Sequence, residues 1–330
     1  MKVFVTGGNG FIGSVVVRQL VSAGHRVVCL LRETSRTERI DGLPVERALG
    51  DVRDRASLES PMADCACTVH LAAPASWDDG ESSTLREIIE DGTRHLLEVA
   101  GARPGRRVVV VSSTAAISAS ERPEVFDEQT EFAVDDETLG YAHAKHRAEQ
   151  ITLDAFRRGV QAVIVNPAEV YGPGDTALGT AGNLIDFATS TPVLVCRGGT
   201  SVVHVDDVAA GIIAALDRGK AGERYILGGD NLTIRELAEL VLELVGRRAM
   251  IVTVPNALAR AAARAVVRLH IPVPFNAHVV PYATRYWFVD NAKARRELGV
   301  TFRSARETLA STLDWLKASG RLSSKSTESS

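Results

Sequence analysis

Tyr141 and Lys145 could move a proton, because a phenol and an ammonium lie four positions apart. Both fall within residues 141–158, whose apolar spacing predicts a helix, so the two side chains share one helix face. A nearby ammonium favours the phenolate, and we expect Lys145 to lower the pKa of Tyr141 so that it can act as a general acid or base near neutral pH. Ser112-Ser113-Thr114 ends a predicted strand and supplies hydroxyls that could orient a carbonyl or an alcohol. The pair alone is a weak signal that usually marks a helix surface, and it gains weight from this hydroxyl run and from a glycine-rich turn at the N-terminus.

The segment Thr6-Gly-Gly-Asn-Gly-Phe-Ile-Gly13 has the glycine spacing of a dinucleotide-binding turn. A pyrophosphate needs backbone N–H donors, close approach of the chain and a helix N-terminus, and glycines at three positions of this turn allow all of them. Such spacings also arise by chance in ordinary turns. Here a strand is predicted over residues 2–6 and a helix over residues 11–23, which is the context that the fingerprint requires. The predicted cofactor contacts in this turn are Gly7, Gly10, Phe11, Ile12 and Gly13.

The end of the second predicted strand distinguishes the two nicotinamide dinucleotides. An acidic residue there hydrogen-bonds the ribose 2′-hydroxyl of NAD, whereas an arginine accommodates the 2′-phosphate of NADP. The chain has Arg32 and Arg36 at this place and no Asp at the strand end, although Glu33 partly opposes the two guanidinium groups. Because a guanidinium pairs well with phosphate, the sequence favours NADP(H) over NAD. Asp51 and Val52, which follow the third predicted strand, are expected at the adenine edge.

The elements that must position these residues alternate between short β-branched runs and longer helical patterns. This alternation is typical of a parallel sheet covered by helices, so we predict an α/β fold with a doubly wound parallel Rossmann sheet and a smaller C-terminal substrate lobe. Strands are predicted over residues 2–6, 26–31, 45–49, 68–73, 107–112, 161–166 and 225–227, and helices over residues 11–23, 85–100, 141–158, 206–217, 232–245 and 255–270.

The regular alternation weakens after Asn166, which suggests a second lobe in a chain of this length. The C-terminal end is Ser-rich without an apolar period, as is typical of a disordered tail. We predict an NADP(H)-binding domain over residues 1–166 with parts of 201–230 returning to it, a substrate-binding lobe over 167–200 and 231–318, and a disordered tail over 319–330.

Residues 255–270 predict a helix rich in Ala and Arg, which we interpret as a lid of the smaller lobe. A helix of this composition could also lie on a membrane surface, but its basicity is modest and its apolar face has no aromatic residue. Asp206 and Asp207 are expected to cap the helix that follows them rather than to bind metal. We expect His204 to be a buried strand-end histidine that bonds to the backbone.

Composition indicates a cytoplasmic enzyme. The net charge of −3 gives no electrostatic footprint for nucleic acid. The first strand begins at once, so we expect no signal peptide, and no apolar run is long enough to span a bilayer. The four cysteines lack metal-ligand spacing and are interpreted as buried thiols, so no metal site is expected.

These motifs together resemble the extended short-chain dehydrogenases/reductases of the NAD-dependent epimerase/dehydratase superfamily, in order from Met1 to about residue 317. The matching segments are residues 6–13, 50–54, 70–73, 112–114, 141–145, 171–175, 204–209 and 290–299. The resemblance implies catalysis by Thr114, Tyr141 and Lys145, with Ser113 as a neighbour that touches substrate and Lys145 also holding the nicotinamide ribose. It adds Leu71, Ala72, Ala73 and Pro167 to the cofactor contacts, and it implies a homodimer face on the helices over residues 85–100 and 141–158.

The branch that the chain resembles best is that of dihydroflavonol 4-reductase and 3β-hydroxysteroid dehydrogenase. That branch has an arginine after the second strand, as this chain has Arg32. It also lacks the Asn that other branches have in the helix before Gly92-Thr93, and this chain has Ile89 at that position. Sugar-nucleotide epimerases usually carry arginines where this chain has residues 199–203 and Asn166, and 4,6-dehydratases carry an acidic pair where it has residues 115–116.

We therefore expect NADP(H)-dependent reduction of a ketone or aldehyde, or oxidation of the alcohol, in a small-molecule substrate. A nucleotide-sugar 4-epimerase is the alternative, and a non-catalytic NADP(H) sensor is disfavoured because both Tyr141 and Lys145 are present. Trp77 and Tyr171 are predicted substrate contacts, and for both, as for Trp287, core packing is an equal alternative. The predicted pocket walls are residues 74–77, 166–171, 183–187 and 272–287.

Overall fold

The protein is described by a computed structural model that covers residues 1–74, 82–269 and 277–322. Trp77, part of the predicted wall over residues 272–287 and most of the predicted tail lie outside the described residues.

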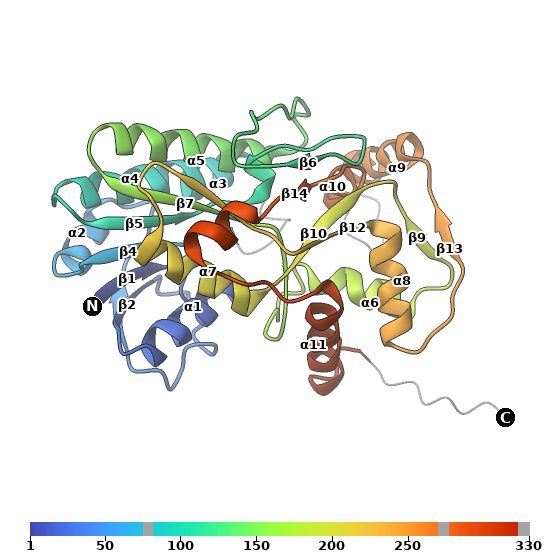
Figure 1. Ribbon diagram of the computed structural model, residues 1–330, viewed down its shortest axis with the longest axis horizontal. Helices are drawn as coiled ribbons and strands as arrows, with labels where there is room; N and C mark the ends of the chain where they lie inside the picture. The colour runs from blue at the N-terminus through green and yellow to red at the C-terminus, as the bar shows by residue number, and fades with distance from the viewer. Residues whose placement is uncertain (75–81, 270–276, 323–330) are drawn as a thin grey trace.

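A seven-stranded parallel sheet forms the N-terminal part of the molecule (Figure 1). Its order is β11-β7-β5-β4-β1-β2-β3, so the chain moves outward from β1 to β3 and then returns to the other side of β1 at β4. Ligands of such sheets bind at this switch point, beyond the carboxyl ends of the central strands. The doubly wound α/β fold is therefore confirmed. The strands are β1 (Lys2–Thr6), β2 (Arg26–Leu31), β3 (Val45–Leu49), β4 (Cys67–His70), β5 (Arg107–Val111), β7 (Gln161–Pro167) and β11 (Arg224–Leu227).

Helices cover both faces of this sheet, because its β-branched strands present apolar side chains to both sides. On one face α1 (Phe11–Ser22) packs along α7 (Val205–Arg218). On the other face α2 (Ala56–Met62), α4 (Gly92–Gly101) and α5 (Gly140–Arg157) lie side by side (Figure 1). The two faces thus have separate apolar cores.

The C-terminal part has a third core around a small mixed sheet of order β12-β10-β8. Here β10 (Gly199–His204) pairs antiparallel with β12 (Asp230–Thr233) and parallel with β8 (Glu169–Tyr171). Around this small sheet lie α6 (Ala181–Thr189), α8 (Ile234–Leu244), α11 (Ala305–Ala318) and the strand pair β9 (Val193–Val195) and β13 (Ile251–Thr253). The remaining elements are the strand pair β6 (Val125–Phe126) and β14 (Phe288–Val289), α9 (Asn256–Leu269), α10 (Val280–Ala283) and η3 (Ala277–Val279). Two short helices pack on the large-sheet part instead, η2 (Thr114–Ala116) against α5 and η4 (Ala294–Leu298) against α7. The chain returns from the C-terminal part to the large sheet at β11. The predicted division into domains stays a prediction.

Two local predictions need correction. The helix predicted over residues 85–100 consists of α3 (Ser82–Leu85), a π-helical turn η1 (Arg86–Asp91) and α4. The helix over residues 206–217 is not capped by an aspartate. The ring of His204 accepts the Asp206 N–H at 3.1 Å, and Asp207 instead accepts the backbone N–H of Arg303 at 2.8 Å. His204 is buried and bonded to the backbone, as expected.

Candidate active site

The glycine-rich turn joins β1 to α1 through contacts that only glycine permits. Gly7 has a φ of +68°, and a Cβ on it would lie 2.8 Å from the carbonyl carbon of Leu71. A Cβ on Gly13 would lie 2.1 Å from the Gly7 carbonyl oxygen. Gly10 precedes α1 without any side-chain cap, so the first N–H groups of the helix are available to an anion. The turn therefore fits a dinucleotide pyrophosphate, with Leu71 and Ala72 closing it from the end of β4.

Arg39 is a residue of this region that the motifs did not indicate. Its guanidinium donates to the carbonyl oxygens of Asn9 at 3.4 Å and Gly174 at 3.1 Å, and to the hydroxyl of Thr176 at 2.5 Å. It thus ties the glycine turn to the loop after β8. No local spacing links these residues, so the sequence carried no signal for this role.

The end of β2 presents two exposed arginines. Arg32 and Arg36 have no ion pair among the described residues. Asp51 lies near Arg32 but is engaged by Arg53, which holds the pKa of the Asp51 carboxyl below its usual range and forms an ion pair with it at 2.8 Å. Val52 is buried and packs against Gly92. The predicted cofactor contacts of this region therefore lie together at the carboxyl edge of the sheet.

Tyr141, Lys145 and Ser113 converge where β5 ends and α5 begins. The Lys145 Nζ lies 5.7 Å from the centre of the Tyr141 ring and donates to the Val111 carbonyl at 3.0 Å. The phenol of Tyr141 hydrogen-bonds with the hydroxyl of Ser113. Thr114 is buried in the following turn of η2. The structure therefore brings the predicted proton donor, its cation and the strand-end hydroxyls to one place.

The pKa of Tyr141 departs from the expectation. Burial raises it from 10.0 to about 12, against the hydrogen bond from Ser113, which lowers it. Burial also disfavours the charged form of Lys145 and lowers its pKa from 10.5 to about 8, although the charge of Glu149 acts in the opposite direction. The expected lowering of the Tyr141 pKa was wrong because desolvation of the phenolate outweighs an ammonium whose own charge is disfavoured. Tyr141 is thus a phenol at neutral pH.

Glu149 supports this cluster from one helical turn beyond Lys145. Its carboxylate accepts the side-chain N–H of Asn166 at 2.6 Å and faces Arg224 at 3.4 Å. Asn166 also donates to the carbonyl of Ser113 at 2.9 Å, which fixes the loop that carries the hydroxyls. The spacing of four residues from Lys145 was the signal that could have identified Glu149.

A chain of hydrogen bonds through His70 connects the glycine turn to η1. Thr93 donates its hydroxyl to the Ile89 carbonyl at 2.5 Å, so His70 Nε2–H must donate to Thr93. His70 Nδ1 then accepts the hydroxyl of Thr6 at 2.8 Å. Burial and, to a smaller extent, the nearby Lys145 charge lower the pKa of His70 from 6.5 to about 3, so the ring is neutral. The uncharged chain holds β1, β4 and η1 in register beneath the site.

Two aromatic residues wall the site beside Tyr141. Tyr282 stacks on Trp287 with ring centres 5.5 Å apart and accepts the indole N–H on its carbonyl at 3.0 Å. Both belong to the apolar cluster that includes Tyr141. Arg285 forms an ion pair with Asp136 at 2.7 Å and holds this segment against the loop before α5. Part of the predicted wall over residues 272–287 thus lies next to the proton donor.

The remaining predicted contacts fall in two groups. Pro167 ends β7 and is buried, and Ala73 follows β4 and is exposed. Tyr171 is fully buried in the C-terminal core, where its hydroxyl donates to Glu169 at 2.7 Å and accepts from Asn183 at 2.8 Å. This position is that of core packing, and a contact with substrate stays a prediction.

The sheet order, the uncapped glycine turn and the Tyr-Lys-Ser cluster define a dinucleotide-dependent oxidoreductase of the short-chain dehydrogenase/reductase type. Residues 3–228 match the model of the NAD dependent epimerase/dehydratase family, and the chain belongs to this family. It is an NAD(P)-dependent oxidoreductase of the extended type. In the described residues, no helix combines the length and apolar composition needed to cross a bilayer.

Several curated proteins are similar over nearly the whole chain. A putative dihydroflavonol 4-reductase of Synechocystis sp. is 32% identical and is matched over 96% of this chain and 95% of its own length. The sterol demethylase protein B of Methylococcus capsulatus is 31% identical over 98% of this chain and 100% of its own. A 4-hydroxy-2-methyl-3-oxo-4-farnesyl-3,4-dihydroquinoline-1-oxide ketoreductase of Stigmatella aurantiaca is 32% identical over 97% of both.

Solved structures agree with the fold. The protein gox2253 superposes with a TM-score of 0.84 at 31% identity, over 97% of this chain and 99% of its own. A dTDP-glucose 4,6-dehydratase of Streptomyces venezuelae, solved with NAD bound, superposes with a TM-score of 0.77 at 25% identity, over 98% of this chain and 99% of its own. The resemblance predicted from the motifs is therefore confirmed.

Proposed function

We propose that this protein transfers hydride between NADP(H) and a carbonyl or alcohol carbon of a small, largely apolar substrate. Bound NADPH supplies the hydride, and the chain supplies the proton and the orientation. The observation that carries the proposal is the cluster at the end of β5, where Tyr141 hydrogen-bonds with Ser113 and lies beside Lys145.

Each residue of the cluster has its own role in the proposed reaction. Tyr141 is protonated at neutral pH, because burial raises its pKa to about 12, so it can donate to a carbonyl oxygen as reduction proceeds. Lys145 holds the nicotinamide ribose and stabilises the phenolate that remains. Thr114 and Ser113 orient the carbonyl oxygen, and Asn166 fixes their loop through the Ser113 carbonyl.

The preference for NADP(H) rests on the end of β2. Arg32 and Arg36 are exposed there, and the strand ends on Leu31 without an acidic side chain. A 2′-phosphate would find two guanidinium groups at this edge, while a ribose 2′-hydroxyl would find no carboxylate on the strand end. Asp51 does not replace that carboxylate, because Arg53 engages it.

The apolar substrate class is supported by the site walls and by the names of relatives. Trp287 and Tyr282 present aromatic surface beside Tyr141. Relatives are named for a dihydroflavonol, a farnesyl dihydroquinoline oxide and a sterol. Asn166 stands where a nucleotide-sugar enzyme usually has a cation for the diphosphate. The homodimer through α4 and α5 remains part of the proposal, and sedimentation velocity would test it.

The test is a panel of carbonyl compounds assayed for NADPH and NADH oxidation, with UDP-sugars as the contrasting set. We expect NADPH-dependent reduction of apolar ketones or aldehydes, and Tyr141→Phe should lower kcat by about two to four orders of magnitude while NADPH binding persists. Tyr286→Phe is the matched control, because it removes the same hydroxyl from a tyrosine whose ring packs on Phe288 and which is not part of the apolar cluster around Tyr141. Conversion of a UDP-sugar without net NADPH consumption would establish the epimerase alternative, and normal turnover by Tyr141→Phe would remove Tyr141 as the acid.

A further inference from the structure

Helix α9 (Asn256–Leu269) has an apolar face that the described protein leaves uncovered. Leu258, Ala262, Ala265 and Leu269 follow the spacing i, i+4, i+7, i+11, which places them in one line along the helix. All four are exposed, and Leu258 and Leu269 keep 61% and 66% of their surface in solvent. Ala263, on the opposite side, is the buried residue of the helix. The amphipathic pattern therefore points an apolar stripe away from the core.

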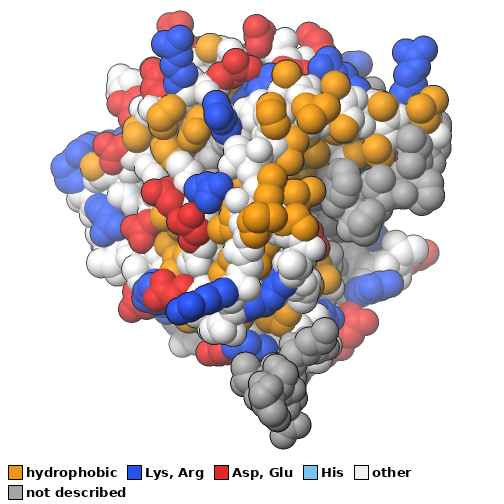
Figure 2. All heavy atoms as spheres, turned by 90° about the vertical axis from the view of Figure 1, so that its right-hand side faces the viewer, with side chains coloured by type: hydrophobic (Ala, Val, Ile, Leu, Met, Phe, Trp, Pro, Cys, Tyr) orange, Lys and Arg blue, Asp and Glu red, His pale blue; other side chains and the backbone are white. Residues whose placement is uncertain are grey.

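The neighbouring strands add apolar surface at the same end of the molecule. Leu194 on β9 and Met250 just before β13 are 61% and 66% exposed, and the two strands pair with each other. Figure 2 views this end, which carries α8, α9, β9 and β13 in Figure 1, and shows exposed hydrophobic side chains among both basic and acidic side chains. Large exposed apolar areas rimmed by charge mark interaction surfaces.

The charge on α9 is mostly basic. Arg260, Arg264 and Arg268 form a row on the helix, of which Arg260 is paired with Glu121 and Arg268 lies nearest the apolar stripe. Between residues 244 and 289 the sequence has six arginines and no Asp or Glu, in a protein whose net charge is −3. In the described part of the chain, Arg264 and Arg268 have no acidic partner.

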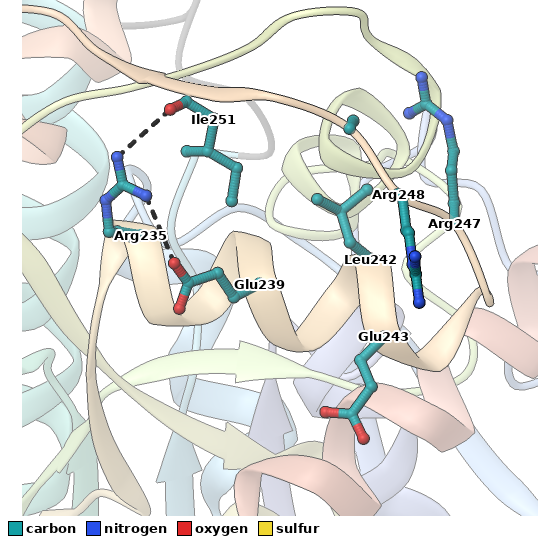
Figure 3. A pocket seen from close by; sticks show the side chains of 8 residues that line it. Arg235, Glu239, Leu242, Glu243, Arg247, Arg248 and Ile251 are labelled. Atoms are coloured by element: carbon teal, nitrogen blue, oxygen red, sulfur yellow. Dashed lines mark hydrogen bonds and ion pairs between the residues drawn. The ribbon is translucent and has the colours of Figure 1, made fainter.

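The nearby groove between α8 and β13 does not neutralise this end (Figure 3). Its glutamates are already engaged, because Arg235 lies 3.4 Å from Glu239 and Arg306 lies 2.8 Å from Glu243. Arg248 also lines the groove and adds to the basic side chains. The partner of the α9 face must therefore supply both apolar contact and negative charge.

The sequence alone favoured a lid, but the exposed leucines of the stripe and the arginines without acidic partners among the described residues change that interpretation. We infer that α9 is a membrane-contact helix that lays its apolar stripe into the interface of an anionic lipid bilayer. An interfacial helix has this combination of a strong apolar face, basic residues beside it and low net hydrophobicity. Arginine stems can also bury their methylenes while the guanidinium reaches the headgroups. A second copy of this chain fits the face less well, since a two-fold contact would place Arg264 and Arg268, which have no acidic partner among the described residues, against their own copies.

The helix is fixed to the body so that its stripe stays outside. Arg260 donates to the Thr284 carbonyl at 3.1 Å and forms an ion pair with Glu121 at 2.8 Å. Thr284 directly follows α10, which carries Tyr282 beside Tyr141. Contact with a bilayer would therefore bring the aromatic wall of the site close to the lipid surface. The inference stands on the surface of α9 and does not depend on the proposed reaction.

The test is sedimentation of the full chain with phosphatidylcholine vesicles, with and without one quarter phosphatidylglycerol, at low and at physiological salt. We expect binding that requires phosphatidylglycerol and weakens with salt. The double variant Arg264→Gln/Arg268→Gln should lower the partition coefficient at least tenfold, and Leu258→Gln/Leu269→Gln should do the same. Leu49→Gln is the matched control, because Leu49 is a similarly exposed leucine at the far edge of the large sheet on β3 and should leave binding unchanged.

Because the changed residues are exposed, the variants should melt like the wild type and keep NADPH affinity, which shows that they fold. Absence of wild-type binding to either vesicle overturns the inference, as does binding that ignores both double variants. A wild-type oligomer whose mass falls in the leucine variant, without vesicle binding, would instead assign the face to a second copy. None of these outcomes bears on carbonyl reduction, which is measured without vesicles.

Discussion

Lys145 is a buried ammonium, and its burial lowers the free energy of unfolding of the protein. Its side chain is only 5% exposed, and burial lowers its pKa from 10.5 to about 8. That difference corresponds to about 3 kcal/mol by which the folded protein disfavours the charged form at neutral pH. The Val111 carbonyl accepts a hydrogen bond from the ammonium at 3.0 Å, which a replacement at this position would leave without a donor. Lys145 is therefore expected to destabilise the fold that it serves.

Replacing Lys145 with methionine removes the charge and keeps a side chain of similar length. At pH 7 we expect Lys145→Met to raise the free energy of unfolding by about 2 kcal/mol, while carbonyl reduction is lost. Urea unfolding followed by circular dichroism measures the first effect. Lys293→Met is the matched control with the opposite sign, because Lys293 lies 2.7 Å from Glu223 and covers the Tyr225 ring, so its loss should destabilise.

The pH dependence of the stability difference between the wild type and Lys145→Met tests this reasoning. Between pH 8 and 10.5 the unfolded chain binds the Lys145 proton and the folded chain has released it, so the stability contribution of this group rises with pH in that window. The advantage of Lys145→Met should therefore shrink by about 2 kcal/mol between pH 7 and pH 10. A variant that is less stable than the wild type at pH 7, or an advantage that is the same at pH 10, would refute the reasoning.

Four further substitutions test the rest of the site. Gly13→Ala places a Cβ 2.1 Å from the Gly7 carbonyl oxygen, so NADPH affinity measured by fluorescence titration should fall at least tenfold. Ser113→Ala removes a hydrogen bond that lowers the pKa of Tyr141, so the basic limb of the pH–rate profile should move to higher pH, whereas Thr114→Val should lower kcat without moving it. Arg32→Asp should shift the ratio of kcat/KM for NADPH over NADH at least tenfold towards NADH.

The large sheet could be predicted because its strands are short β-branched runs bounded by turn residues. The strands over residues 2–6, 26–31 and 45–49 have the predicted limits, and α1 ends within one residue of its prediction, next to Gly24. In each case the hydrophobic period and the terminating residue are local signals, and the core that surrounds these elements agrees with them.

The features that could not be predicted depend on partners distant in sequence. The π-helical turn η1 leaves the apolar period of its helix nearly unchanged, and it is stabilised where Thr93 bonds both Ile89 and His70. The direction of the Tyr141 pKa depends on how deeply the phenol is buried, which no spacing states. Arg39 contacts a loop more than a hundred residues away.

Asn166 bears both on which substrate the site could bind and on how its catalytic residues are held. In the sequence, Asn166 in place of an arginine before Pro167 indicates only that a diphosphate substrate is disfavoured. In the structure the Asn166 amide donates to the Ser113 carbonyl and to Glu149, which already faces Arg224. A second guanidinium at this position would draw the Glu149 carboxylate towards itself and away from the field that keeps Lys145 charged. A neutral amide instead hydrogen-bonds the Glu149 carboxylate without adding charge, and the same amide fixes the hydroxyl loop through the Ser113 carbonyl.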